Sequence, residues 1–412
     1  MWDIMRNPWC PLTNPTGYVN VGVAENALMH DYLLSYMNTQ LTLPAKYLTY
    51  NDGAIGAERL RRAMAAFLTK HLHPVKPLTS DNLLVTNGVS SAIEHMSWAF
   101  TDPGEGILLG RPYYGTFIPD MSVRPGAVVV GVEFGDVDPF SMDAVECYEK
   151  ALVRFQETTG KKVRAVMLCH PHNPLGRCYP RQTIVGLMRL CQKYQIHLIS
   201  DEIYALSVWE NTIDEDVSPV GFESALSIDM TGIIDPSLVH LLWGMSKDFG
   251  ANGIRLGVII SQSNPVLLEA VKGVSLYTYS SSVSEHLAAV ILEDEEFTTR
   301  YIRLNRQRMG ESYAFAAGYL KDCGIEYATG ANAAFFLWVN LGRKYCELHP
   351  EMGDLGDGIG DKVMEVLLQR KVFLASGGLF GSERSGWFRI VFTHERGYLE
   401  EALRRVVLAL HD

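Results

Sequence analysis

Residues 244–257 read Gly-Met-Ser-Lys-Asp-Phe-Gly-Ala-Asn-Gly-Ile-Arg-Leu-Gly, and this stretch indicates both the fold and the chemistry of the chain. It joins one apolar segment, Val239–Trp243, to a second one, Leu256–Ile260. Lys247 follows a serine in this loop, and Arg255 stands at the start of the second apolar segment. A primary amine that can form an imine and a guanidinium that can hold a phosphate are therefore tied to one short loop.

Apolar and amphipathic segments alternate from about residue 58 to residue 261, which is typical of a mainly parallel sheet covered by helices. Several of the apolar segments are continuous, as expected for strands that are buried on both faces. We predict the α/β class, with a seven-stranded, mainly parallel sheet in a large domain and a smaller α+β domain. The predicted strands are Leu83–Thr86, Ile107–Leu109, Val128–Val132, Val163–Cys169, Ile196–Ser200, Val239–Trp243 and Leu256–Ile260.

The pattern changes after residue 285. A long helix is predicted at Glu295–Cys323, short strands at Phe335–Asn340, Val372–Leu374 and Phe388–Phe392, and a terminal helix that includes Leu399 and Leu410. We expect residues 1–45 to form an N-terminal arm and part of the small domain. Residues 46–285 would form the large domain, and residues 286–412 the small C-terminal domain.

The composition narrows the class of protein and its partners. Hydrophobic residues make up 47% of the 412 residues and charged residues 20%, which is ordinary globular composition. The net charge of −11 argues against a nucleic-acid partner, because phosphate backbones select basic surfaces. No apolar run approaches the ~18 residues of a membrane span, so no membrane partner is expected. The seven scattered cysteines suit reduced thiols, and we expect a cytoplasmic location.

Polar motifs follow the predicted strands at their carboxyl ends, where ligands bind in open α/β sheets. One strand is followed by His170-Pro-His-Asn-Pro-Leu-Gly176, and another by Asp201-Glu-Ile-Tyr204. A third is followed by Asn87-Gly-Val-Ser-Ser91, which opens a helix whose N-terminal amides can hold a phosphate. With the Lys247 loop, these motifs favour pyridoxal 5'-phosphate (PLP), which carries an aldehyde at one end and a phosphate dianion at the other.

On these motifs the chain resembles a fold-type-I PLP-dependent transferase of the class I/II aminotransferase superfamily. It is most similar to the 1-aminocyclopropane-1-carboxylate (ACC) synthase-like branch. The resemblance covers nearly the whole chain, from Gly22-Val-Ala-Glu-Asn26 to Gly386-Trp-Phe-Arg389. It implies PLP as the cofactor, an amino-acid-type substrate, and a homodimer with shared active sites.

The resemblance also implies a role for each site residue. Lys247 would form the imine with the cofactor and later move the α-proton of the substrate. Asp201 would pair with the pyridinium nitrogen, while Tyr204 and Asn173 would hydrogen-bond the phenolate oxygen of the ring. The remaining implied contacts are Tyr114 on the ring face, the Val89 amide, Ser90, Ser246 and Arg255 on the phosphate, Arg389 on the substrate carboxylate, and Glu25 near the substrate.

Two positions depart from the family pattern. Gly244 stands where the family usually has a hydroxyl residue that contacts the phosphate. ACC synthases have a tyrosine that reaches into the neighbouring subunit's site, and the matching stretch here is Tyr50-Asn-Asp-Gly-Ala-Ile-Gly56. Gly53 or Ala54 lies near the place of that tyrosine, which sets the chain apart from ACC synthase itself.

Structural roles compete with these functional ones. Asp201 could cap the following helix, and Asn173, between two prolines, could be a turn residue. Arg389 could be a buried ion-pair partner. His170 and His172 resemble a metal pair, but no further ligand motif accompanies them, so we predict no metal site and a structural use. Tyr114 could serve in packing, and Glu25 could be a surface residue.

The resemblance favours a PLP enzyme that removes the α-proton of an amino-acid-type substrate and stabilises the resulting carbanion. Transamination and β- or γ-elimination, as in carbon–sulfur lyases, are close alternatives, because both use the same lysine, aspartate and arginine. ACC synthase and a catalytically idle PLP-binding homologue are further alternatives. A dehydrogenase, suggested by the fold alone, lacks the glycine fingerprint after the first strand.

Overall fold

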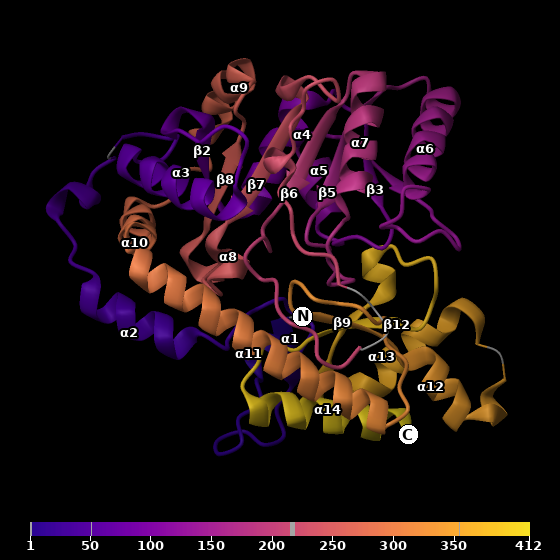
Figure 1. The fold of residues 1–412 in the computed structure, drawn as a ribbon. Helices are drawn as coiled ribbons and strands as arrows, with labels where there is room; N and C mark the ends of the chain where they lie inside the picture. Colours follow the sequence, from indigo (N-terminus) through magenta and orange to yellow (C-terminus); the bar gives the residue numbers. More distant parts are fainter. Residues whose placement is uncertain (1, 51, 215–218, 354) are drawn as a thin grey trace.

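The computed structural model describes residues 2–50, 52–214, 219–353 and 355–412. A seven-stranded sheet forms the centre of its larger part (Figure 1). In spatial order its strands are β2 (Leu83–Asn87), β8 (Leu256–Ile260), β7 (Val239–Gly244), β6 (His197–Asp201), β5 (Val163–Cys169), β3 (Gly106–Gly110) and β4 (Val128–Val132).

Strands β7, β6, β5, β3 and β4 run parallel to one another, and β8 runs antiparallel to both of its neighbours. The predicted α/β class with a mainly parallel, seven-stranded sheet is therefore confirmed. Three of the predicted strands have the observed bounds, and the ends of the other four differ by one residue.

Helices cover both faces of this sheet. Alternate residues of β5 belong to two different hydrophobic clusters, with Ala165 and Met167 in one and Val166 and Leu168 in the other. Since side chains alternate between the faces of a strand, each face has its own core. This explains the continuous apolar runs in the sequence. The helices of this part are α3 (Glu58–Leu72), α4 (Gly88–Phe100), α5 (Phe117–Ser122), α6 (Ala144–Thr159), α7 (Arg181–Tyr194), α8 (Met245–Asp248), α9 (Pro265–Ser275) and α10 (Ser282–Glu293).

The smaller part is built around an antiparallel sheet of β11 (Ala375–Ser376), β12 (Trp387–Val391) and β9 (Phe336–Asn340). Figure 1 shows the long helix α11 (Glu295–Asp322) running between the larger sheet and α14 (Arg396–Leu410). The other helices here are α12 (Leu341–Leu348) and α13 (Ile359–Gln369). None of the helices among the described residues is long and apolar enough to cross a lipid bilayer.

The N-terminal segment contains α1 (Trp2–Arg6), β1 (Val19–Asn20) and α2 (His30–Gln40). Strand β1 pairs in parallel with β10 (Val372–Phe373), so the start of the chain lies against its C-terminal part. This pairing supports the proposal that residues 1–45 complete the small domain. The boundaries at residues 45 and 285 stay a prediction.

Strand β8 and helix α4 approach each other closely where both begin. A Cβ atom on Gly257 would lie 2.4 Å from the carbonyl carbon of Gly88 and 2.6 Å from the amide nitrogen of Val89. Both atoms belong to the backbone, so they cannot move aside as a side chain could. The absence of a side chain at residue 257 therefore sets how near the N-terminus of α4 lies to the Lys247 loop.

We expect Gly257→Ala to destabilise the protein by about 1–3 kcal/mol, because the methyl group would overpack this backbone contact. Gly253→Ala is the matched control in the same segment, since a Cβ atom there would meet nothing within 4 Å. The free energy of unfolding, from urea titration followed by circular dichroism, measures the difference. Equal stability of the two variants would contradict the close approach.

Candidate active site

A pocket opens at the carboxyl ends of β5, β6 and β7 and at the N-terminus of α4. Nine of the predicted site residues line it, although they come from segments far apart in the sequence. These are Val89, Ser90, Tyr114, Asn173, Asp201, Tyr204, Ser246, Lys247 and Arg255. Ala24, Ile93, Phe117, Cys169, Ile203 and Asn252 complete the wall.

Lys247 lies in α8, directly after β7, and its amine faces a backbone carbonyl. Its Nζ donates a hydrogen bond of 2.7 Å to the carbonyl oxygen of Ala24. Burial, with the positive charges of Arg389 and Arg255, lowers the pKa of Lys247 to about 8. An appreciable fraction of the amine is therefore neutral near physiological pH, as a nucleophile or a proton acceptor requires.

Asp201 is the last residue of β6, and its side chain is buried. Its Oδ1 accepts a hydrogen bond of 3.2 Å from the amide of Ile203. Burial raises the pKa of Asp201 to about 7. This turn contact uses one oxygen of the carboxylate, and Asp201 also lines the pocket. The structural role and a ligand-binding role are therefore compatible.

Arg389 comes from β12 and is buried beside the pocket rather than in its wall. Its Nη1 donates to Asn173 Oδ1 at 2.9 Å, and its Nη2 donates to the Gly22 carbonyl at 2.6 Å. The guanidinium carbon lies 4.5 Å from the ring centre of Phe336 and 4.8 Å from that of Phe380.

The Arg389 guanidinium has a free donor, because its buried Nε has no hydrogen-bond partner among the described residues. Burial lowers the pKa of Arg389 to about 10. No carboxylate forms an ion pair with it in the part of the chain that the structure describes. The ion-pair alternative therefore finds no partner there, and the charge is available for an anionic ligand.

The start of α4 and Arg255 form the cationic end of the pocket. Asn87, the N-cap residue, makes no side-chain cap. Arg255 has a positive φ of 55° and donates to the carbonyls of Asn252 at 3.0 Å and Asn87 at 3.5 Å. A Cβ atom on Gly88 would lie 2.2 Å from Arg255 Nη2, so the guanidinium lies across the helix start. Helix N-terminal amides and an arginine together suit a phosphate group.

Gly244 faces Gly257 across the β7–β8 pair. A Cβ atom on Gly244 would lie 2.6 Å from the carbonyl oxygen of Leu256 and 3.1 Å from Val89 Cγ2. The glycine at position 244, where the resemblance implies a hydroxyl residue, therefore allows β7 to pack closely against β8.

The remaining predicted residues differ in how the structure places them. Tyr204 is buried and packs edge-on against Phe335 and Phe336, and burial raises its pKa well above the ordinary value. Tyr114 is partly buried, and its ring lies 5.5 Å from that of Phe117. Glu25 is exposed and does not line the pocket, although its charge acts on Lys247.

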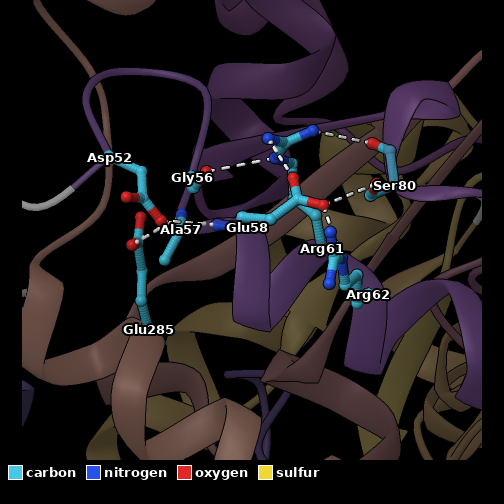
Figure 2. Close-up of polar contacts among 8 residues, drawn as sticks. All are labelled: Asp52, Gly56, Ala57, Glu58, Arg61, Arg62, Ser80 and Glu285. Atoms are coloured by element: carbon cyan, nitrogen blue, oxygen red, sulfur yellow. Dashed lines mark hydrogen bonds and ion pairs between the residues drawn. The ribbon is translucent and has the colours of Figure 1, made fainter.

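The loop that precedes α3 is anchored by hydrogen bonds (Figure 2). These are Glu58 N to Asp52 Oδ2 at 2.8 Å, Ala57 N to Glu285 Oε2 at 2.9 Å, and Arg61 Nε to the Gly56 carbonyl at 3.1 Å. Gly53, in this loop, has a φ of +89° and open space around the position of a Cβ atom. Asn51, within the stretch compared with the ACC synthase pattern, lies outside the described residues.

His170 and His172 use their ring nitrogens for backbone contacts. His170 Nε2 lies 3.0 Å from the Glu223 carbonyl, and His172 Nδ1 accepts from the Leu175 amide at 3.3 Å. Burial lowers the pKa of His170 to about 4 and that of His172 to about 3. A search of the described residues finds no group of three or more His, Cys, Asp or Glu side chains that could hold a metal ion.

Several contributors to the site were not predicted from the sequence. Ala24 and Gly22 act through backbone carbonyls, which every residue type carries. Asn252 donates to the same Ala24 carbonyl at 3.3 Å and leaves its Oδ1 buried without a partner. The Gly22–Asn26 motif was a usable signal, but only its acidic residue was singled out.

The donor set fits PLP. An amine of lowered pKa lines the same pocket as the start of α4 and Arg255, and a buried carboxylate at the end of β6 can pair with a ring nitrogen. The unpartnered Arg389 Nε adds a site for a carboxylate beside the pocket. Among the described residues, these groups meet at one edge of the sheet.

Comparisons with known proteins agree with this geometry. The family model described as "Aminotransferase class I and II" matches residues 46–406. The chain is 30% identical to the "Probable aminotransferase sirI" of Leptosphaeria maculans, over 99% of this chain and 95% of that protein. It is also 30% identical to "1-aminocyclopropane-1-carboxylate synthase 7" of Arabidopsis thaliana, over 97% of this chain and 89% of the relative.

Solved structures show the same fold. The aspartate aminotransferase from Thermus thermophilus with maleate superposes with a TM-score of 0.76 at 20% identity. The match covers 95% of this chain and 91% of that one.

The Lys247 environment yields a prediction about pH. The reactivity of the Lys247 amine toward an acylating reagent should rise with a midpoint near pH 8, because only the neutral amine reacts. Arg389→Gln should move the midpoint to higher pH, since it removes a positive charge that lowers the Lys247 pKa. Mass spectrometry of the labelled Lys247 peptide, in the cofactor-free protein, measures both midpoints.

Arg384→Gln is the control for this experiment, because Arg384 is an exposed arginine that shortly precedes Arg389 in the chain. Its midpoint should equal that of the unmodified protein. A midpoint that stays the same in Arg389→Gln would contradict the electrostatic coupling between the two buried cations.

Proposed function

This chain belongs to the aminotransferase class I and II family, and from that premise we propose that it transfers the amino group of an amino-acid-type substrate with PLP as its cofactor. The observation that carries the proposal is the buried Nε of Arg389, which has no partner among the described residues, together with the effect of the Arg389 charge on the Lys247 amine. A carboxylate bound there would place the neighbouring α-carbon near a proton acceptor.

Bound PLP supplies an aldehyde for the substrate amine and a conjugated ring that draws electrons from the α-carbon. We propose that Asp201 holds its ring nitrogen and that Tyr204 and Asn173 hold its phenolate oxygen. Tyr114 would cover the ring face. The phosphate would be held by the Val89 amide, Ser90, Ser246 and Arg255.

The residues of the chain then have distinct tasks. Arg389 binds the substrate carboxylate in a two-pronged contact and thereby orients the α-hydrogen. Lys247 Nζ accepts that proton and can return it, because its lowered pKa lies near the working pH. The Ala24 carbonyl holds the free amine in position. Burial of Asp201 and Arg389 keeps water away from these two charges, and Lys247 is partly buried beside them in the pocket wall.

Transamination is favoured over ACC formation, because Gly53 and Ala54 stand near the place of the ACC synthase tyrosine. An idle homologue is disfavoured, since the amine, the carboxylate and the guanidinium are all present at one edge of the sheet. Elimination uses the same groups and is separated from transamination by experiment.

Lys247→Ala should abolish turnover. It should also abolish the visible absorbance that PLP shows when it is bound covalently to a lysine, because no other amine lines the pocket among the described residues. Lys272→Ala is the control, since Lys272 is an exposed lysine paired with Glu269. Absorbance spectra and amino-group transfer assays of both variants measure the effect. Unchanged absorbance and turnover in Lys247→Ala would refute the proposal.

Transamination and elimination can be distinguished by whether turnover requires a second substrate. In transamination, release of keto acid beyond one equivalent per site requires an added keto-acid acceptor. A screen of amino acids, including thioether-bearing ones, with and without such an acceptor therefore decides the question. Steady keto-acid release with thiol or ammonia and without acceptor would instead identify a lyase.

We further propose a homodimer with shared active sites, as the family resemblance implies. Large exposed side chains support this, with Tyr50 83% and Tyr277 82% exposed. A cytoplasmic location is proposed because all seven cysteines lie in the described residues as free thiols.

A further inference from the structure

The segment Gly377–Arg384 joins the smaller part of the molecule to the loop that follows β3. The amide of Tyr113 donates to the Phe380 carbonyl at 2.8 Å. Gly381 has a φ of +60°, and a Cβ atom there would lie 2.6 Å from Tyr113 Cζ. Backbone and ring therefore meet directly, so the position of this segment and that of Tyr113 are linked.

Glu383, near the end of this segment, binds the larger part of the molecule through its carboxylate, a contact called here the clamp. Its Oε1 accepts from the amide of Phe134 at 2.8 Å, and its Oε2 accepts from the amide of Gly135 at 2.9 Å. Both donors are backbone amides just after β4. Hydrogen bonds to a carboxylate are stronger than those between neutral groups, and two of them fix both the distance and the orientation of the side chain.

An ion pair across the same boundary is weaker than these two hydrogen bonds. Arg384 Nη2 lies 3.4 Å from Asp136 Oδ1, and both side chains are largely exposed to solvent. Exposed pairs of this kind contribute little, because water and salt screen them. Glu383 is also exposed, but its carboxylate accepts two hydrogen bonds of 2.8 and 2.9 Å, so it is the stronger side-chain contact of this segment with the residues that follow β4.

The clamped segment touches two parts of the candidate active site. Phe380 lies against the Arg389 guanidinium at 4.8 Å and packs edge-on against Trp338 at 5.5 Å. Tyr113, which bonds Phe380, directly precedes Tyr114 in the pocket wall. A shift of the segment would thus move both the proposed carboxylate ligand and the proposed ring-stacking residue.

We propose that Glu383 is a positioning residue for the reaction. Its clamp on the amides of Phe134 and Gly135 holds Phe380 so that Arg389 and Tyr114 keep the spacing that the substrate complex needs. Glu383 itself touches neither substrate nor cofactor. This inference rests on the proposed function for its kinetic consequence, while the clamp is defined by contacts alone.

The test uses the full-length holoenzyme and three variants. Glu383→Ala removes both acceptors, Glu383→Gln keeps one acceptor oxygen, and Ser385→Ala is the neighbouring control, whose hydroxyl contacts Asp357 instead. Hydrogen–deuterium exchange of the peptide that covers Phe134 and Gly135 reports the clamp directly. Steady-state kinetics with the best amino acid from the substrate screen report its consequence.

We expect exchange at this peptide to be faster in Glu383→Ala, intermediate in Glu383→Gln, and unchanged in Ser385→Ala. The KM for the amino acid should rise roughly tenfold in Glu383→Ala, because Arg389 would be held less well in its position for the substrate carboxylate, while kcat changes less. A partly unfolded enzyme would instead lose kcat at constant KM. A rise in KM with little change in kcat therefore identifies a positioning role.

Unchanged exchange and unchanged KM in Glu383→Ala would overturn the inference, as would a loss of kcat alone. Failure of the proposed function has a different signature. In that case the unmodified protein would show no Lys247-dependent absorbance or turnover, whereas the exchange result at Phe134 and Gly135 would still report whether the clamp exists.

Discussion

The candidate site depends on three buried or partly buried charged groups that form no ion pair within the part of the chain that the structure describes. Asp201 and Arg389 are buried, Lys247 is partly buried in the pocket wall, and burial is the largest cause of each pKa shift. Burying an unpaired charge is costly, and a structure keeps such groups only where packing and hydrogen bonds hold them. The cost is reduced when a ligand with complementary charge binds, which makes the burial itself a basis for ligand affinity.

The parallel sheet makes this arrangement possible. Neighbouring strands end at one edge, so residues that are remote in the sequence, such as Asn173, Asp201 and Lys247, arrive at the same pocket. The antiparallel strand β8 then returns the chain from that edge and delivers Arg255 to the start of α4. The N-terminal segment closes the site from outside through the carbonyls of Gly22 and Ala24.

Much of the fold and of the pocket wall could be predicted from the sequence. Strand positions followed from continuous apolar runs, because burial on both faces leaves a signal within a few residues. Pocket residues followed from polar motifs at strand ends, because the sheet edge brings them together. Contacts such as Val19 with Val372, or Arg389 with Asn173 and Gly22, join residues hundreds of positions apart. No local pattern encodes such pairs, and a backbone carbonyl leaves no mark in residue type.

The pairing of Gly244 with Gly257 bears on how this protein could be altered. A side chain at residue 257 would meet the backbone of Gly88 and Val89, and a hydroxyl residue grafted at 244 would collide with the Leu256 carbonyl. In directed evolution this closes the route to a further phosphate ligand at residue 244, because the nearest obstacle there is a backbone atom. Changes that tighten cofactor retention in this lineage would have to arise on the open side of the cup, where Ser90 and Arg255 face solvent.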